Sequence, residues 1–160
     1  MAAANYDLYI EQGATFRFTM YYGRRDGTLD SGGNPVVIPY DLTGCAARMQ
    51  IRQRRGAQVA AAATTTNGGI VIDDPTAGHI IITLTDETTQ SLTFSKAKYD
   101  LEIGYPSGDV VRILEGKVTI SPNITQPSML DNVSEGDTTD YDLSDQEVSF
   151  DPSLNTPTIF

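Results

Sequence analysis

The chain has 160 residues, enough for one domain with a hydrophobic core and too few for two domains of ordinary size. Its formal net charge is −10, of which residues 126–160 carry −8, because this segment has eight acidic side chains and no basic one. Phosphates would repel such a segment, so its charge argues against nucleic-acid binding and favours a partner with a basic groove.

The single cysteine and the N-terminal sequence limit the redox and membrane chemistry of the chain. Cys45 has no partner for an internal disulfide, and a small buried side chain is its simplest interpretation. The stretch "MAAANYDLYI" lacks the basic and apolar regions of a signal peptide. No apolar run approaches the ~20 residues that a membrane span needs. We therefore expect a soluble protein without membrane contacts, made in a reducing cytoplasm.

Alternating apolar and polar residues predict β-strands from residue 5 to residue 125. In "ATFRFTMYY" every second side chain from Phe16 to Tyr22 is apolar, which is typical of a half-buried strand. The stretch "CAARMQIRQRR" repeats the pattern, with Met49 on the inner face and Arg48 on the outer face. Further strands are expected in "GIVID", "HIIITLT", "YDLEIGY" and "VVRILEGKVTI". In the last of these the apolar phase changes near Gly116, which predicts a β-bulge there.

The predicted strands are separated by sequences rich in turn residues, namely "RRDGTLDSGGNP", "TNGG", "DDPTAG", "YPSGD" and "SPN". We expect two hairpins, with turns at Asp74–Gly78 and at Pro106–Asp109. The stretch "TDETTQSLTF" predicts one short helical turn with Thr85 or Asp86 as its N-cap. Ala60–Thr66 is expected to be a flexible loop or an edge strand. About seven or eight short strands at this spacing predict an all-β sandwich.

The alternation ends near Thr125, so we expect a sandwich domain in residues 1–125 and a separate segment in residues 126–160. In this acidic segment the apolar side chains are single and spaced. A solvated spacer would lack such side chains, and a small domain would need them closer together. We therefore expect an extended arm that docks on a partner. Its candidate contact residues are Met129, Leu130, Tyr141, Leu143, Val148, Phe150, Leu154, Ile159 and Phe160.

Few side chains of the chain suit catalysis or metal binding. His79 is the only histidine, so any Ser-His-Asp or Cys-His site must use it, and a strand-edge position near solvent is its simpler interpretation. Asp73–Asp74 and Asp86–Glu87 stand at a predicted turn and a predicted helix start, where acids are favoured without any catalytic role. The stretch "DYDLSDQEVSFD", which begins at Asp140, matches a calcium loop poorly because Asp145 stands in place of the glycine. We expect no enzyme activity, no catalytic residue, no metal site and no cofactor.

The main basic cluster comprises Arg48, Arg52, Arg54 and Arg55. A nucleic-acid interface would need interleaved aromatic residues and a basic overall charge, and both are missing here. One interpretation is that the cluster binds the acidic segment of a neighbouring copy, which would build rings or lattices. The alternative is an ordinary solvated strand end.

Tyr99 opens a late strand after the predicted helical turn. A tyrosine corner of immunoglobulin-like sandwiches places a tyrosine in this way. Ordinary packing of an aromatic ring in the core is the alternative.

Four stretches occur in the order "YDLYIEQGATFRFTMYY", "YDLTGCAARMQIR", "GGIVIDDPTAGHIIITLTDETTQSL" and "KYDLEIGYPSGDVVRILEGKVTISPNIT". In order and spacing they resemble a small immunoglobulin-like domain that is widespread in virion structural proteins of tailed bacteriophages. A similar plan occurs in the N-terminal domain of baseplate upper proteins and in related tail-fibre adaptors. The resemblance covers about residues 5–125 and does not extend to the acidic segment.

The resemblance implies an antiparallel, immunoglobulin-like β-sandwich with a non-enzymatic, structural role in the virion. Its expected partners are other virion proteins and copies of itself, with no nucleic acid, so a homo-oligomer within the particle is expected. The tail, baseplate or fibre-attachment region is the first expectation, and capsid decoration is the alternative. A carbohydrate-binding module for host recognition remains a further alternative, although the chain has no tryptophan. Its exposed aromatic residues would be Tyr21, Tyr22, Tyr40 and Tyr105.

Overall fold

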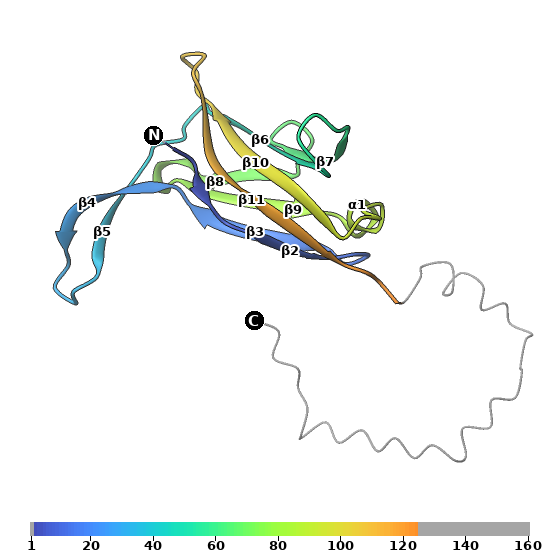
Figure 1. The fold of residues 1–160 in the computed structure, drawn as a ribbon. Coiled ribbons are helices and arrows are strands. Elements are labelled where there is room, and N and C mark those ends of the chain that lie inside the picture. Colours follow the sequence, from blue (N-terminus) through green and yellow to red (C-terminus); the bar gives the residue numbers. More distant parts are fainter. Residues whose placement is uncertain (1, 125–160) are drawn as a thin grey trace, which may run out of the picture. The chain divides into compact units, whose positions relative to one another are not determined.

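The computed structural model describes residues 2–124, which fold into an all-β sandwich of two sheets with a projecting hairpin (Figure 1). The predicted fold class is therefore confirmed. In this part of the chain the large sheet has six strands: β1 (Ala4–Asn5), β2 (Leu8–Glu11), β6 (Ala46–Arg52), β7 (Val59–Thr64), β10 (Lys96–Gly104) and β11 (Val110–Ser121). The small sheet of the same part has three: β3 (Phe16–Tyr21), β8 (Ile70–Asp74) and β9 (His79–Leu84).

The strands of both sheets pair antiparallel except at the N-terminal edge of the large sheet. There β1 and β2 both pair with β11 in parallel, with Ala4 opposite Leu114 and Leu8 opposite Val118. The remaining order across this sheet is β11, β10, β6 and β7. The N-terminal segment therefore lies along the last strand of the described chain.

The predicted alternation in β6 is confirmed by burial. Met49 and Ile51 are 1% and 0% exposed, whereas Arg48, which precedes Met49 in the strand, is exposed. Both apolar side chains belong to one core cluster with Ile80 and Ile82 of the small sheet. Full burial of one such side chain stabilises the fold by about 1.5–3 kcal/mol. The core thus fixes which face of the large sheet points to solvent.

Both predicted hairpin turns are confirmed. The β8–β9 connection forms the short 3-10 helix η1 (Pro75–Ala77), where an Asp74 side-chain oxygen accepts a hydrogen bond from the Ala77 amide at 3.3 Å. Gly78 follows at φ 64°, and a Cβ there would lie 2.2 Å from the Tyr22 carbonyl oxygen. The β10–β11 turn is closed by a 2.8 Å hydrogen bond from the Tyr105 amide to the Asp109 carbonyl. Such close approaches explain the glycine in the first turn.

The predicted helical turn is α1 (Asp86–Gln90), and its N-cap is Thr85 rather than Asp86. The Thr85 hydroxyl oxygen accepts a hydrogen bond from the Thr88 amide at 3.2 Å. The two interpretations of Ala60–Thr66 are also decided, because Val59–Thr64 forms the edge strand β7.

The predicted β-bulge exists, but it lies at Ile113 rather than near Gly116. Leu101 of β10 faces Leu114, and the next residue, Glu102, faces Arg112, so Ile113 is the extra residue. Gly116 has another role, because a Cβ at this position would lie 2.1 Å from the carbonyl oxygen of Tyr6. The glycine therefore allows the N-terminal segment to approach β11.

The stretch predicted to be a single turn, "RRDGTLDSGGNP", belongs instead to a hairpin of β4 (Gly23–Leu29) and β5 (Pro35–Pro39). This β4–β5 hairpin projects from the sandwich (Figure 1, left). Every residue of β4 after Gly23 is exposed. Because neither face packs on the core, the sequence shows no apolar alternation that would mark these strands.

Tyr99 does not form a tyrosine corner. Its hydroxyl donates a 2.6 Å hydrogen bond to the carbonyl oxygen of Tyr6, 93 positions earlier, whereas a tyrosine corner uses a carbonyl a few residues upstream. The ring itself is buried, and burial raises the pKa of the Tyr99 hydroxyl well above its usual value, with a further contribution from the Asp7 carboxylate. The side chain therefore ties the N-terminal segment to the large sheet.

The compact unit formed by these residues ends at Ile124. All nine predicted contact residues of the arm, from Met129 to Phe160, lie outside the described residues. No helix within residues 2–124 is long and apolar enough to cross a membrane.

Candidate functional site

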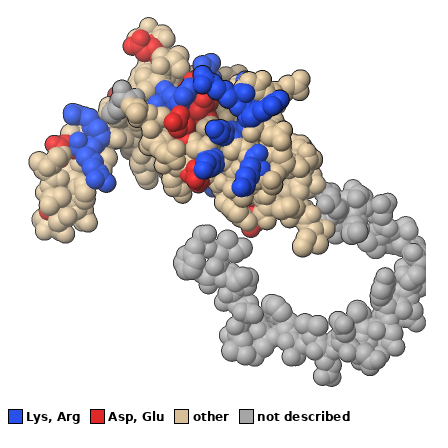
Figure 2. Space-filling view, in the orientation of Figure 1, with Lys and Arg blue, Asp and Glu red and all other residues tan. Residues whose placement is uncertain are grey.

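The solvent-facing side of the large sheet collects most of the positive charge of the protein (Figure 2). Alternate residues of β6, β10 and β11 point their side chains outward there, and the turn after β6 adds two more cations. Seven of the eleven basic residues of the chain line this surface, which we call the basic face. They are Arg48, Arg52, Arg54, Arg55, Lys98, Arg112 and Lys117.

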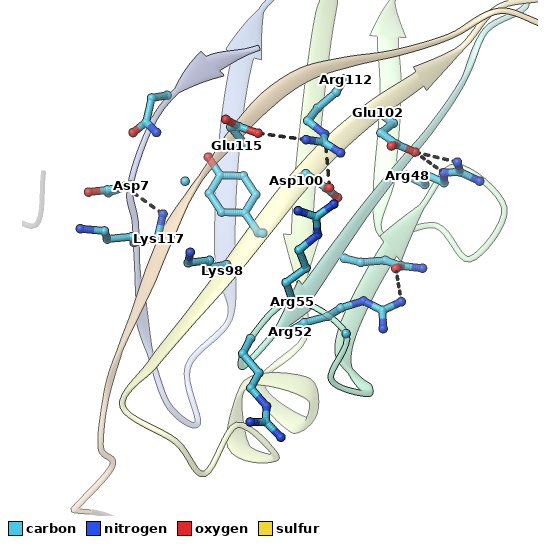
Figure 3. Close-up of a pocket in the computed structure, with 16 residues that line it drawn as sticks. Asp7, Arg48, Arg52, Arg55, Lys98, Asp100, Glu102, Arg112, Glu115 and Lys117 are labelled. Atoms are coloured by element: carbon cyan, nitrogen blue, oxygen red, sulfur yellow. Dashed lines mark hydrogen bonds and ion pairs between the residues drawn. The ribbon is translucent and has the colours of Figure 1, made fainter. Parts of the chain in front are cut away.

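The basic face is a shallow hollow with a volume of about 860 Å³ (Figure 3). Besides the seven cations, four carboxylates line it: Asp7, Asp100, Glu102 and Glu115. The difference is a formal excess of three positive charges in the lining. An open, charged hollow of this kind suits a polar partner that lies across the sheet, because it offers little enclosed apolar surface to a small ligand.

Three of the four carboxylates pair with two of the cations. Arg48 contacts Glu102, with an Nη2–Oε2 distance of 2.6 Å. Arg112 contacts Asp100, with an Nε–Oδ2 distance of 3.4 Å, and also Glu115, with an Nη1–Oε2 distance of 3.2 Å. These contacts are drawn as dashed lines in Figure 3.

The fourth carboxylate, Asp7, accepts a hydrogen bond from the backbone. The Lys117 amide donates a 2.9 Å hydrogen bond to an Asp7 side-chain oxygen. Together with the 2.9 Å bond from the Tyr6 amide to the Glu115 carbonyl, this contact fixes the N-terminal segment on β11. All four acids of the hollow therefore have a partner already.

Four cations of the basic face make neither an ion pair nor a side-chain hydrogen bond within residues 2–124: Arg54, Arg55, Lys98 and Lys117. All four residues are exposed. Arg52 is held differently, because its guanidinium donates to the Gln50 side chain at 3.0 Å and to the Ala57 carbonyl. The basic face therefore presents positive charge that the domain itself does not neutralise.

The sequence identified only part of this surface. It grouped Arg48, Arg52, Arg54 and Arg55, and the structure places all four on the basic face. Reasoning from neighbouring positions missed Lys98, Arg112 and Lys117, which lie on β10 and β11. The stretch "KAK" in β10 could have predicted an outward position for Lys98, because Ala97 between the two lysines is buried and neighbouring residues of a strand face opposite sides.

The β4–β5 hairpin forms a second exposed surface, and it combines apolar and basic side chains. Leu29, Val37 and Ile38 are 66%, 54% and 38% exposed. Arg24 and Arg25 are exposed as well and have no ion-pair partner among residues 2–124. The blue residues on the projecting hairpin in Figure 2 are part of this surface.

The acidic residues of the hairpin stabilise its turns. The Asp26 carboxylate accepts hydrogen bonds from the hydroxyl and the amide of Thr28 at 2.6 and 2.7 Å, and these bonds lower the pKa of Asp26. The Asp30 carboxylate accepts from the amides of Asn34 and Gly32 at 2.9 and 2.8 Å, which lowers the pKa of Asp30. Both acids stay ionised at neutral pH and hold the hairpin in shape.

The candidate catalytic groups have structural contacts. His79 is half-buried at the start of β9, where its Nδ1 contacts the Asp73 carboxylate and its ring stacks on Tyr21 at a centroid distance of 4.4 Å. Asp86 and Glu87 lie in the first turn of α1. Within residues 2–124 no group of three or more His, Cys, Asp or Glu side chains is placed to hold a metal ion.

Cys45 was expected to be a buried small side chain, and it is half-buried against the core. Burial raises the pKa of its thiol, and the nearby Asp41 carboxylate adds to this shift. A raised thiol pKa disfavours the reactive thiolate at neutral pH.

Three of the four tyrosines considered for carbohydrate binding are partly buried. Tyr22 and Tyr40 contact each other in a tilted arrangement at 4.6 Å, and they pack against the core together with Tyr105. Burial, followed by the neighbouring Tyr105 and Tyr40, raises the pKa of Tyr22 to about 12. Tyr21 is the exposed one of the four, at 70%. The four rings therefore do not form one exposed aromatic platform.

No family model matches the chain, and no curated protein matches it. Solved structures do match, among them the crystal structure of CopC from Methylosinus trichosporium OB3b. That alignment has 9% sequence identity and a TM-score of 0.38, and it covers 74% of this chain and 89% of the CopC chain. A likeness at this level carries no argument about function.

Proposed function

We propose that this protein is a non-catalytic structural component of a tailed-phage virion, placed in the tail, baseplate or fibre-attachment region. The observation that carries the proposal is the exposure of two chemically distinct contact surfaces, the basic face and the β4–β5 hairpin. The described residues do not present a comparable catalytic site, since His79, the single histidine, contacts Asp73 and stacks on Tyr21. Contact surfaces without a reaction site are what an assembly module needs.

The exposed hairpin supports an assembly role on energetic grounds. A two-stranded hairpin without a core beneath it is marginally stable in water. Apolar side chains such as Leu29 and Val37 gain about 25 cal/mol for each Å² that a partner covers. A hairpin of this kind is favoured when a neighbouring protein covers it, as subunits do within a particle.

The attribution to a tailed phage rests on the order of the four sequence stretches that resemble virion immunoglobulin-like domains. The sandwich fold is compatible with this resemblance. The acidic segment, residues 126–160, contributes a third contact element in the proposal, with Phe150, Ile159 and Phe160 as its main apolar contacts. This segment docks on neighbouring virion subunits, so a chain truncated before Gln126 folds but does not enter particles.

The test is immunogold labelling of intact particles with an antibody against residues 1–125, together with mass spectrometry of the purified particles. Particles from which the gene has been deleted serve as the labelling control. Label at the tail tip or on the fibres supports the proposal. Label over the head would identify a capsid decoration protein instead. Absence of the chain from purified particles by mass spectrometry would overturn the virion role altogether.

A further inference from the structure

We propose that the basic face of one copy binds residues 126–160 of a second copy as an extended acidic peptide. This inference rests on the proposed function, because it names one contact through which copies assemble. Its test uses the purified protein rather than particles, so the two proposals can fail separately.

The basic face has cations that are available to an acidic partner. Arg54, Arg55, Lys98 and Lys117 are exposed and have no acidic partner among residues 2–124. The acids of the hollow do not compensate them, because these acids already pair with Arg48 and Arg112 or accept a backbone hydrogen bond. An incoming carboxylate therefore gains a charge-assisted hydrogen bond without breaking an existing pair.

The acidic segment is the part of the chain whose charge complements the basic face. Residues 126–160 carry eight acids and no base, whereas residues 1–125 are nearly balanced with 13 acidic and 11 basic side chains. Opposite charge on the two surfaces speeds their encounter and fixes their orientation. With 35 residues, the segment reaches up to roughly 115 Å when extended, enough to cross the face of a neighbour.

The acids of this segment are spaced in pairs. Six of the eight form three pairs at positions i and i+2, namely Glu135 with Asp137, Asp140 with Asp142, and Asp145 with Glu147. In an extended peptide, residues two apart point to the same side. Each pair therefore presents two carboxylates together. Among the free cations of the basic face, Lys98 and Lys117 stand opposite each other on outward positions of β10 and β11, and the consecutive Arg54 and Arg55 lie in the turn after β6. The cations therefore also stand in pairs.

A nucleic acid fits this surface less well than an acidic peptide. Four carboxylates lie among the cations of the hollow, and they would repel a phosphate backbone whose charges are closely and evenly spaced. Tyr99, the aromatic residue in the lining, is buried and offers no ring for base stacking. A peptide can place its spaced carboxylates against the free cations and avoid the acids.

The experiment measures self-association of the full-length chain by sedimentation velocity over a range of protein concentrations. The face variant carries Arg54→Glu, Arg55→Glu and Lys98→Glu, and the segment variant carries Asp140→Lys, Asp142→Lys and Asp145→Lys. We expect each variant alone to associate at least about tenfold more weakly than the native chain. An equimolar mixture should associate again, because each variant retains the surface that the other has lost.

A charge-matched control carries Arg17→Glu, Thr19→Glu, Thr66→Glu and Lys96→Glu, which make the same change in net charge but are exposed and lie outside both the basic face and the β4–β5 hairpin. It should associate as the native chain does. Raising the salt concentration to about 1 M, where the Debye length is about 3 Å, should weaken association of the native chain by about tenfold or more. Thermal unfolding of all variants shows whether they remain folded.

Three outcomes would overturn the inference. A native chain that stays monomeric at every concentration would exclude a contact between copies. This outcome covers the case in which the segment binds the domain of its own chain. Equal weakening by the control variant would assign the effect to net charge. A mixture of the two variants that fails to associate, while both are folded, would show that the two surfaces do not bind each other.

Discussion

Substituting Tyr99→Phe removes one hydroxyl group and tests whether the N-terminal segment is held by this side chain. The Tyr99 hydroxyl donates a 2.6 Å hydrogen bond to the Tyr6 carbonyl, which is one of three bonds between residues 6–7 and the large sheet. Loss of a partly buried hydrogen bond costs about 1 kcal/mol, and leaving the carbonyl without a partner adds up to the same amount again. We therefore expect a loss of about 1–2 kcal/mol.

Thermal unfolding followed by circular dichroism measures this loss. A domain of this size loses about 4 °C of Tm for each kcal/mol, so the expected decrease is about 4–8 °C. Tyr9→Phe is the matched control, because Tyr9 lies on the neighbouring strand β2 and is 62% exposed. The control should leave Tm unchanged within about 1 °C.

A local measurement distinguishes loss of this tether from a general loss of stability. Hydrogen exchange should accelerate at the Tyr6 amide, which donates to the Glu115 carbonyl, more than at amides of β6 in the centre of the sheet. If Tyr99→Phe lowers Tm no more than Tyr9→Phe, or if exchange rises equally at the Tyr6 amide and in β6, the bond does not hold the N-terminal segment.

Three further predictions follow from buried contacts. Gly116→Ala should destabilise the domain by at least about 2 kcal/mol in urea unfolding, because its Cβ would lie 2.1 Å from the Tyr6 carbonyl oxygen. Gly104→Ala, where the nearest atom to a Cβ is the Ala46 carbonyl oxygen at 3.9 Å, should cost less. Thr89→Val should cost about 2 kcal/mol, since the buried hydroxyl donates to the Ala14 carbonyl at 2.8 Å; a cost below about 0.5 kcal/mol would contradict this. Burial raises the pKa of both Tyr99 and Tyr22 above the value of ~10 that tyrosine has in an unfolded chain. The stability that these hydroxyl groups contribute is therefore complete below pH ~10. It is lost as pH rises through the folded-state pKa, which is about 12 for Tyr22. Stability measured from pH 9 to about 12 should therefore fall less steeply in Tyr22→Phe than in the native chain, and an unchanged slope would refute the assignment.

The sequence was sufficient where one face of a strand packs on the core. Met49 and Ile51 alternate with arginine and glutamine in β6, and burial of the apolar set decides which face points inward. Turns with a local chemical cause were predictable for a similar reason, because Asp74 caps η1 and Gly78 follows it in a left-handed conformation. In both cases the information lies within a few neighbouring residues.

Contacts between segments that are distant along the chain could not be predicted from the sequence. The position of the β-bulge depends on the register between β10 and β11, and Gly116 is explained by Tyr6, which lies more than a hundred positions earlier. The basic face also depends on contacts between distant residues, since the Arg48–Glu102 pair joins residues 54 positions apart. The β4–β5 hairpin was missed for the opposite reason, because it has no core contact that would impose a pattern.

The two exposed surfaces have different chemistry, and this difference has a consequence for assembly. The basic face and residues 126–160 are separate parts of the chain, so a contact between them is head-to-tail, and each copy gives one surface and receives the other. Head-to-tail contacts close into rings or continue as filaments. The proposed contact does not involve the β4–β5 hairpin, so its exposed Leu29, Val37 and Ile38 remain available to a partner of a different kind. A component that must both join its own copies and attach to another protein needs such a division, because one surface cannot be selected for two partners without weakening its specificity for each.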